Sequence, residues 1–167
     1  MGFKRNILAF FVISALGTLG HFVYGWTGEN MLAGLIFPVN ESIWEHLKLI
    51  YFPSVIYFSA EYFLTYKKPC NYIPAAMTGI FCGMASVVIM YYTISGIIGK
   101  NIDFINILIF FVAIIITISK RNKIISDGLE FSKNQILILS TAFIITAALF
   151  MIWSYLAPRL AIFTPLA

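Results

Sequence analysis

Long apolar runs recur along the whole of this sequence, and their length is the feature that most limits its fold. Each run is bounded by charged residues or by Pro and Gly, and each approaches the roughly 20 residues that a helix needs to cross a bilayer. A helix satisfies its own backbone hydrogen bonds, which lipid cannot do. The pattern predicts five membrane-spanning helices, near residues 6–26, 45–66, 73–98, 102–119 and 135–157.

The composition agrees with a membrane protein and excludes an ordinary soluble enzyme. Of the 167 residues, 60% are hydrophobic and only 11% are charged, whereas soluble domains carry about 25% charged residues. No linker-like or repeated segment interrupts the chain, so we expect residues 1–167 to form a single membrane domain. The predicted fold class is all-α, a polytopic bundle of five transmembrane helices.

The positions of Lys and Arg predict the orientation of this bundle, because positively charged loops stay in the cytoplasm during insertion. With the N-terminus inside and the C-terminus outside, the outer side holds Lys48, Lys100 and Arg159. The inner side holds the larger basic set, which is Lys4, Arg5, Lys67, Lys68, Lys120, Arg121, Lys123 and Lys133. We expect residues 120–133 to form a solvated inner loop. The basic charge therefore reflects topology, and no nucleic-acid partner is predicted.

The first apolar run has an alternative interpretation as a cleaved signal peptide. Lys4 and Arg5 precede it, and Ala15-Leu16-Gly17 resembles a small-residue cleavage site. The run continues well beyond the 7–15 residues of a signal-peptide core. We therefore expect a helix that is retained in the mature protein.

Polar residues are concentrated in residues 21–48, which read HFVYGWTGENMLAGLIFPVNESIWEHLK. This segment holds both histidines and three of the seven acidic residues, and it joins the outer ends of the first two predicted spans. We expect an outward-facing pocket that binds or passes a small polar or cationic species, since carboxylates outnumber the mobile bases there. The candidate ligand-binding residues are His21, Asn40, Glu41, Trp44, Glu45, His46, Lys48, Glu61 and Arg159.

The histidines and carboxylates of this segment also suggest a metal site. Imidazole and carboxylate groups suit zinc and similar divalent transition metals, and the candidate ligands are His21, Glu45 and His46. An alternative function is then a metal-assisted hydrolase at the outer interface, with Glu45 or Glu41 as general base. A third is an accessory subunit of a larger membrane complex. No HExxH motif, nucleotide fingerprint or Ser-His-Asp pattern selects a reaction.

The start of the second predicted span also has a purely structural interpretation. Ser42 to Glu45 fits a capping box, in which Ser42 accepts the N–H of Glu45 and the Glu45 carboxylate returns to the N–H of Ser42. Asn40 would hydrogen-bond its own neighbouring backbone. This interpretation accounts for Asn40, Glu41, Ser42 and Glu45 without a ligand.

Two further residues of the same span are unusual for a helix in lipid. Glu61 lies in the inner half of the span, where a carboxyl group has to be protonated, paired or extended toward the interface. Pro53 removes one helical hydrogen bond and frees the carbonyl of Leu49. A kinked helix with a carboxylate beyond the kink is also found in transport pathways.

Small residues predict where helices approach one another closely. In the third span Ala75, Gly79 and Gly83 recur at four-residue spacing, which is typical of a packing seam in membranes. In the first span, one helix face carries Ser14, Gly17, His21 and Tyr24. We therefore expect His21 to face another helix and not lipid.

The run from His21 to Leu49 resembles a known family. Gly25-Trp26, Gly28, Asn30 and Gly34 are followed by PVNESIWEHLKL at 38–49, and this pattern is similar to that of small integral membrane proteins, common in Gram-positive bacteria, catalogued as a domain of unknown function. Glu61 and the tail around Pro158 look like the same family. The resemblance implies a multi-pass protein of the bacterial plasma membrane, and it implies no chemistry.

Overall fold

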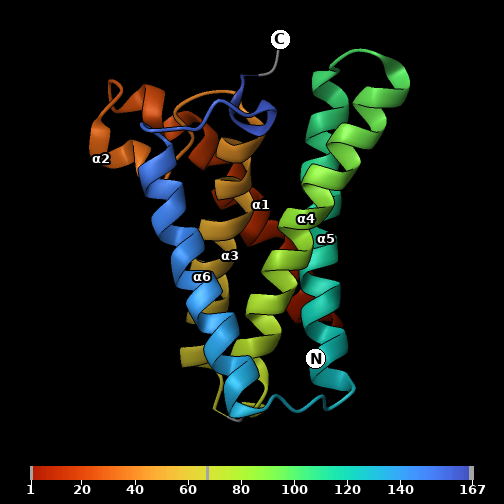
Figure 1. The fold of residues 1–167 in the computed structure, drawn as a ribbon. Coiled ribbons are helices and arrows are strands. Elements are labelled where there is room, and N and C mark those ends of the chain that lie inside the picture. Colours follow the sequence, from red (N-terminus) through yellow and green to blue (C-terminus); the bar gives the residue numbers. More distant parts are fainter. Residues whose placement is uncertain (1, 67, 166–167) are drawn as a thin grey trace.

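The computed structural model describes residues 2–66 and 68–165, and within these ranges it is helical without named strands. Its five long helices are α1 (Phe3–Trp26), α3 (Ile43–Leu64), α4 (Tyr72–Ile98), α5 (Asp103–Ser126) and α6 (Lys133–Trp153). The short helix α2 (Met31–Gly34) lies between α1 and α3, and the 3₁₀ turn η1 (Ala161–Phe163) follows α6. The long helices alternate in direction, and the two termini lie at opposite ends of the molecule (Figure 1).

Four of the long helices, α1, α4, α5 and α6, are long and apolar enough to cross a membrane. Helix α3 has 22 residues but carries Glu45, Lys48 and Glu61. The prediction of a solvated loop over 120–133 is wrong in its first half, because α5 continues to Ser126 and buries Arg121 completely. The physical reason is a buried partner for Arg121, the carboxylate of Glu61.

Helix α3 occupies the middle of the bundle and contacts α1, α4, α5 and α6 (Figure 1). Twelve of its 22 residues are buried. The carbonyl of Leu49, which Pro53 leaves without a helical donor, faces Gly17 of α1. A Cβ atom at Gly17 would lie 2.8 Å from that oxygen. The proline and the glycine therefore permit α1 and α3 to pack closely.

The predicted seam on α4 is confirmed, and its partner is α5. A Cβ atom at Gly79 would lie 2.6 Å from the carbonyl oxygen of Thr117, and one at Gly83 would collide with the Thr117 hydroxyl. Gly96, further along the same helix, faces open space. The small residues are thus placed where the two backbones meet, as close packing in lipid requires.

Helix α6 lies at the edge of the bundle and buries one residue, Phe150. Its outer surface exposes Ile136, Leu137, Ile138, Ile144, Ile145, Met151 and Ile152. Trp44 of α3 packs against Phe150, Trp153 and Phe163, with ring centroids 4.8–5.1 Å apart. These aromatic contacts fasten α6 and the C-terminal segment to the first turn of α3.

Candidate functional site

The first turn of α3 is capped by its own loop, as the sequence predicts in part. The Oγ atom of Ser42 accepts the N–H of Glu45 at 3.3 Å, and Oδ1 of Asn40 accepts the N–H of Ser42 at 2.9 Å. The second half of the predicted capping box is wrong, because the Glu45 carboxylate does not return to Ser42. It accepts the N–H of Val39 at 2.9 Å instead, since the loop folds back over the helix start.

Glu45 and Lys48 form a fully buried ion pair, with 2.8 Å between Oε2 and Nζ and side-chain exposures of 1% and 0%. The Lys48 ammonium also donates to the carbonyl of Gly34 at 2.8 Å and to the hydroxyl of Ser154 at 2.5 Å. The same hydroxyl lies 3.1 Å from Glu45 Oε1. The pair thus joins the α1–α3 connection, α3 and the end of α6, and its polar atoms are satisfied by protein groups.

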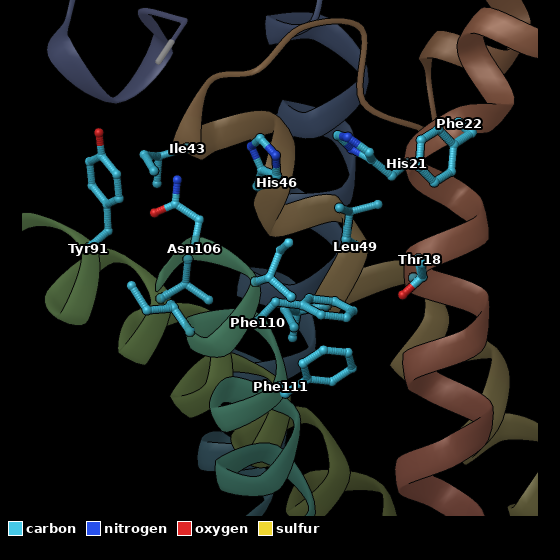
Figure 2. A pocket seen from close by; sticks show the side chains of 15 residues that line it. Thr18, His21, Phe22, Ile43, His46, Leu49, Tyr91, Asn106, Phe110 and Phe111 are labelled. Carbon is cyan, nitrogen blue, oxygen red and sulfur yellow. The ribbon is translucent and has the colours of Figure 1, made fainter. Parts of the chain in front are cut away.

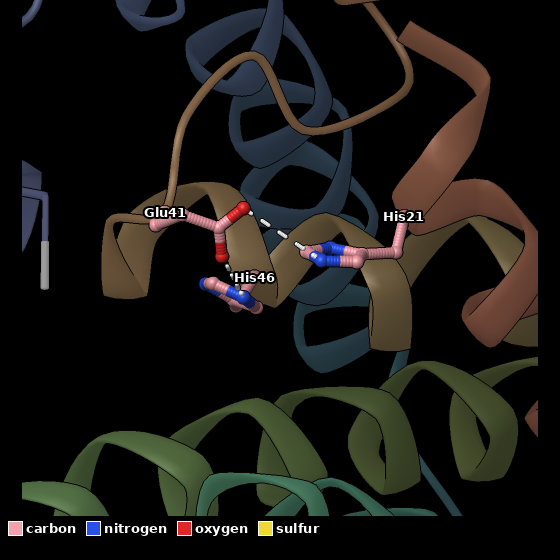
Figure 3. A group of neighbouring side chains, drawn as sticks. All are labelled: His21, Glu41 and His46. Carbon is pink, nitrogen blue, oxygen red and sulfur yellow. Dashed lines mark ion pairs between the residues drawn. The ribbon is translucent and has the colours of Figure 1, made fainter. Parts of the chain in front are cut away.

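A second cluster lies beside this pair and consists of His21, Glu41 and His46, hereafter the histidine cluster. The Glu41 carboxylate lies between the two imidazoles (Figure 3), 3.7 Å from Nε2 of His21 and 3.3 Å from Nε2 of His46. The imidazole rings are stacked with centroids 5.5 Å apart. The Glu41 side chain is 61% exposed and those of the histidines less than 30%. One carboxylate and two imidazoles therefore face each other at the surface.

The backbone partner of His46 selects the tautomer of a neutral ring. Its Nδ1 atom lies 2.8 Å from the carbonyl oxygen of Ser42. A carbonyl oxygen only accepts hydrogen bonds, so Nδ1 carries a hydrogen, and a neutral ring then has its lone pair on Nε2. That lone pair faces the Glu41 carboxylate. Two electron-rich atoms at 3.3 Å repel each other unless a proton or a cation lies between them.

The spacing of the histidine cluster suits a small metal ion. Zinc binds nitrogen and oxygen ligands tetrahedrally at about 2.0–2.2 Å, which separates neighbouring ligand atoms by roughly 3.3 Å. One ligand atom from each of His21, Glu41 and His46 lies within 4.8 Å of the others, so small side-chain movements would bring all three within reach of one ion. The hydrogen bond from His46 Nδ1 to a carbonyl is the usual outer-shell support for a metal-binding histidine.

The structure brings together only part of the metal trio expected from sequence. His21 and His46 meet, whereas the Glu45 carboxylate faces Lys48 and the carboxylate beside the imidazoles is that of Glu41. The Asn40 side chain accepts a hydrogen bond from the loop backbone, and Trp44 packs against Trp153 of α6. Arg159 lies on the exposed segment after α6.

A cavity of about 350 Å³ adjoins the histidine cluster. Its wall comes from α1, α3, α4 and α5, and apart from Thr18, His21, His46, Tyr91 and Asn106 its lining is apolar. His21 and His46 lie at one end of the cavity, and Phe110 and Phe111 lie toward the other (Figure 2). The imidazoles thus lie at one end of a mostly apolar space.

Glu61 lies in a separate network at the opposite end of α3, and of the three predicted states it is paired. Its carboxylate contacts Nη1 of Arg121 at 2.5 Å and Nε of Arg5 at 3.2 Å, and it also accepts the hydroxyl of Tyr72. Sequence reasoning missed Arg121 because a basic residue after an apolar run was assigned to a loop. The available signal was spacing, since Ala113, Thr117 and Arg121 share one face of α5.

The sequence matches a family of unknown function, DUF6512, over residues 3–166. The chain belongs to this family. The matched range of this DUF6512 member contains all of the candidate site residues, including the histidine cluster and Glu61. No curated protein and no solved structure matches the chain.

Proposed function

We propose that this protein is a five-span protein of the bacterial plasma membrane that binds one divalent transition-metal ion at its outer face. The ligands are His21, Glu41 and His46, and the N-terminus is inside. The observation that carries the proposal is the Glu41 carboxylate held between two imidazole nitrogens, one of which is oriented by the Ser42 carbonyl.

The buried state of its charges supports α3 as the fifth span. Glu45 is neutralised by Lys48, and Glu61 by Arg121, all buried inside the bundle, and Glu61 also pairs with the partly exposed Arg5. Paired groups that face the bundle interior are the form in which ionisable side chains occur in membranes. At 1.5 Å per residue, 22 residues extend about 33 Å, which matches the hydrocarbon thickness of a bilayer.

The exposed basic residues also support the N-in orientation, with the buried Lys48 set aside. Once this lysine is removed from the outer set, the exposed basic residues there are Lys100 and Arg159. The other end exposes a larger group, Lys4, Lys68, Lys120, Lys123 and Lys133. The five exposed basic residues at this second end outnumber the two at the first, an excess in the same direction as in the sequence count, and it favours this second end as cytoplasmic.

The contacts of the two candidate bases favour ion binding over the hydrolase alternative. A general base needs a lone pair that is free to take a proton from water. The Glu45 oxygens accept hydrogen bonds from Lys48, Ser154 and Val39, and Glu41 is used as a ligand. Neither carboxylate is then available to activate a water.

The test is the zinc content of protein purified in detergent and reloaded with zinc. We expect about one zinc per chain in the wild type and none in the Glu41→Gln variant or in the variant with both His21→Ala and His46→Ala. Glu29→Gln is the matched control, because Glu29 is an exposed acid of the same outer loop and should leave the zinc content unchanged. Folded wild-type protein without zinc, or equal zinc in all variants, would contradict the proposal.

A further inference from the structure

The cavity beside the histidine cluster has two chemically different ends, and this decides what it can hold. His21 and His46 line it at one end, and its walls carry Leu49, Ile50, Val87, Ile109, Phe110 and Phe111. A polar solute placed among these walls would lose its hydrogen bonds to water. The lining therefore suits a hydrocarbon chain with a polar head at the histidines.

The size of the cavity selects among lipids. Its volume is about 350 Å³, near the lower end of the roughly 300–1,000 Å³ of small-molecule sites. This accommodates one chain of medium length. A diacyl phospholipid has two longer chains and a larger head group, so the volume favours an occupant with a single chain.

The proposed ion provides the contact for the head group. Three protein ligands leave one position open on a four-coordinate zinc ion, and carboxylate oxygen is an established zinc ligand. His21 and His46 line the cavity, whereas Glu41 does not. An ion held by the three is therefore at the cavity edge, with Glu41 on its outer side.

In a membrane, the head group of an amphiphile has to provide most of the selectivity of its binding. Lipid tails are as apolar as the walls of the cavity, so a chain gains little hydrophobic free energy on leaving the bilayer. Packing contacts hold the chain in place, but selection between amphiphiles has to come from the head. Binding should then require the ion.

We infer that the cavity binds a single-chain anionic amphiphile of the fatty-acid class, whose carboxylate ligates the ion held by His21, Glu41 and His46. This inference rests on the proposed function and adds the ligand class to it. The hydrocarbon chain of this ligand would extend from the imidazoles toward Phe110 and Phe111 (Figure 2).

Neighbouring residues on two walls provide matched variants. On α5, Ile107 lines the cavity and Leu108 does not, although both are about half exposed. On α1, Thr18 lines the cavity and the next residue, Leu19, does not. Ile107→Trp and Thr18→Trp should narrow the cavity, whereas Leu108→Trp and Leu19→Trp add the same ring outside it.

The experiment uses the full chain in nanodiscs and a twelve-carbon fatty acid with a diazirine at the chain end. After irradiation, we expect the label on the α5 peptide that contains Phe110 and Phe111, in the presence of zinc. Labelling should fall at least tenfold with EDTA, in Glu41→Gln, in Ile107→Trp and in Thr18→Trp. It should persist in Leu108→Trp and Leu19→Trp. Excess dodecanoate should compete, and dodecyltrimethylammonium should not.

The zinc content of the same samples separates the two proposals. If the wild type holds one zinc per chain and labelling in Ile107→Trp and Thr18→Trp equals that in the wild type, the lipid inference alone is overturned. Labelling that survives EDTA, or equal competition by a diacyl phosphatidylglycerol, would overturn it in the same way. A folded wild type without zinc would overturn the proposed function, and with it the ion-dependent binding inferred here.

Discussion

Glu41, which precedes the N-cap of α3, and Glu45, in the first turn of α3, are four residues apart in the chain, yet the structure gives them opposite surroundings. Glu45 is 1% exposed, and its two oxygens contact Lys48, Ser154 and the backbone of Val39. Glu41 is 61% exposed and faces two imidazoles without a neutralising Lys or Arg in any ion pair of the described residues. A carboxylate with a complete set of internal partners stabilises the fold. One beside lone pairs is suited to bind a cation.

The largest effect that the comparison predicts comes from Lys48→Met. It leaves the buried Glu45 carboxylate without its cation, and removal of one partner of a buried ion pair costs about 3–5 kcal/mol. We expect the thermal unfolding temperature in detergent to fall strongly. The double variant with Glu45→Gln should recover part of the loss, because no uncompensated charge then remains. A Lys48→Met protein as stable as the wild type would show that the pair does not stabilise the α1–α3 connection.

The network at the other end of α3 extends the comparison to Glu61. Glu61→Gln keeps acceptor capacity for Arg121 and Tyr72 but removes the charge, so we expect a loss of about 1–3 kcal/mol in unfolding free energy. The control is Glu130→Gln, an exposed position on the α5–α6 connection, which should change stability by less than about 0.5 kcal/mol. Equal effects of the two substitutions would show that the ion pairs of Glu61 do not stabilise the fold.

Ser154→Ala tests how much the hydroxyl beside the Glu45–Lys48 pair contributes to the free energy of unfolding. The hydroxyl contacts both members of the ion pair, and its loss should cost about 0.5–1.5 kcal/mol. Zinc content should stay at the wild-type level. If the zinc content falls together with stability, the two clusters are coupled, and the contrast between Glu41 and Glu45 is weaker than the contacts indicate.

Zinc affinity should also depend on pH through the histidine cluster. Protons compete with the ion for the Nε2 lone pairs of His21 and His46, so acidification from neutral pH should weaken zinc binding and release the ion. Titration calorimetry at several pH values measures this. An affinity that does not change with pH would exclude imidazole ligands.

Much of the fold follows from sequence, because apolar length and glycine spacing are local properties. The helices lie close to the predicted spans, and Gly79 and Gly83 pack where a seam was expected. The burial of Arg121 was not predicted, since it depends on Glu61, which is 60 residues away in the chain. Charge counting assigns such a residue to a loop.

The division of roles between Glu41 and Glu45 is also beyond sequence reasoning. Both residues belong to one motif, and an uninterrupted helix would place them on one face, but Glu41 precedes the N-cap Ser42 and lies outside α3. The segment before α3 determines which carboxylate is buried, because it places the Val39 N–H beside Glu45 and the Gly34 carbonyl beside Lys48. The path of that loop depends on tertiary contacts, so no local pattern reveals which carboxylate remains exposed.

The most direct test of the central claim is the zinc-induced shift in thermal unfolding temperature, measured side by side for wild type, Glu41→Gln and Glu45→Gln. A ligand that binds only the folded state at 100 times its dissociation constant stabilises it by about 2.7 kcal/mol. We predict that Glu41→Gln unfolds at the wild-type temperature and gains nothing from zinc, whereas Glu45→Gln unfolds earlier but still gains. A zinc shift retained in Glu41→Gln, or lost in an otherwise stable Glu45→Gln, would contradict the account.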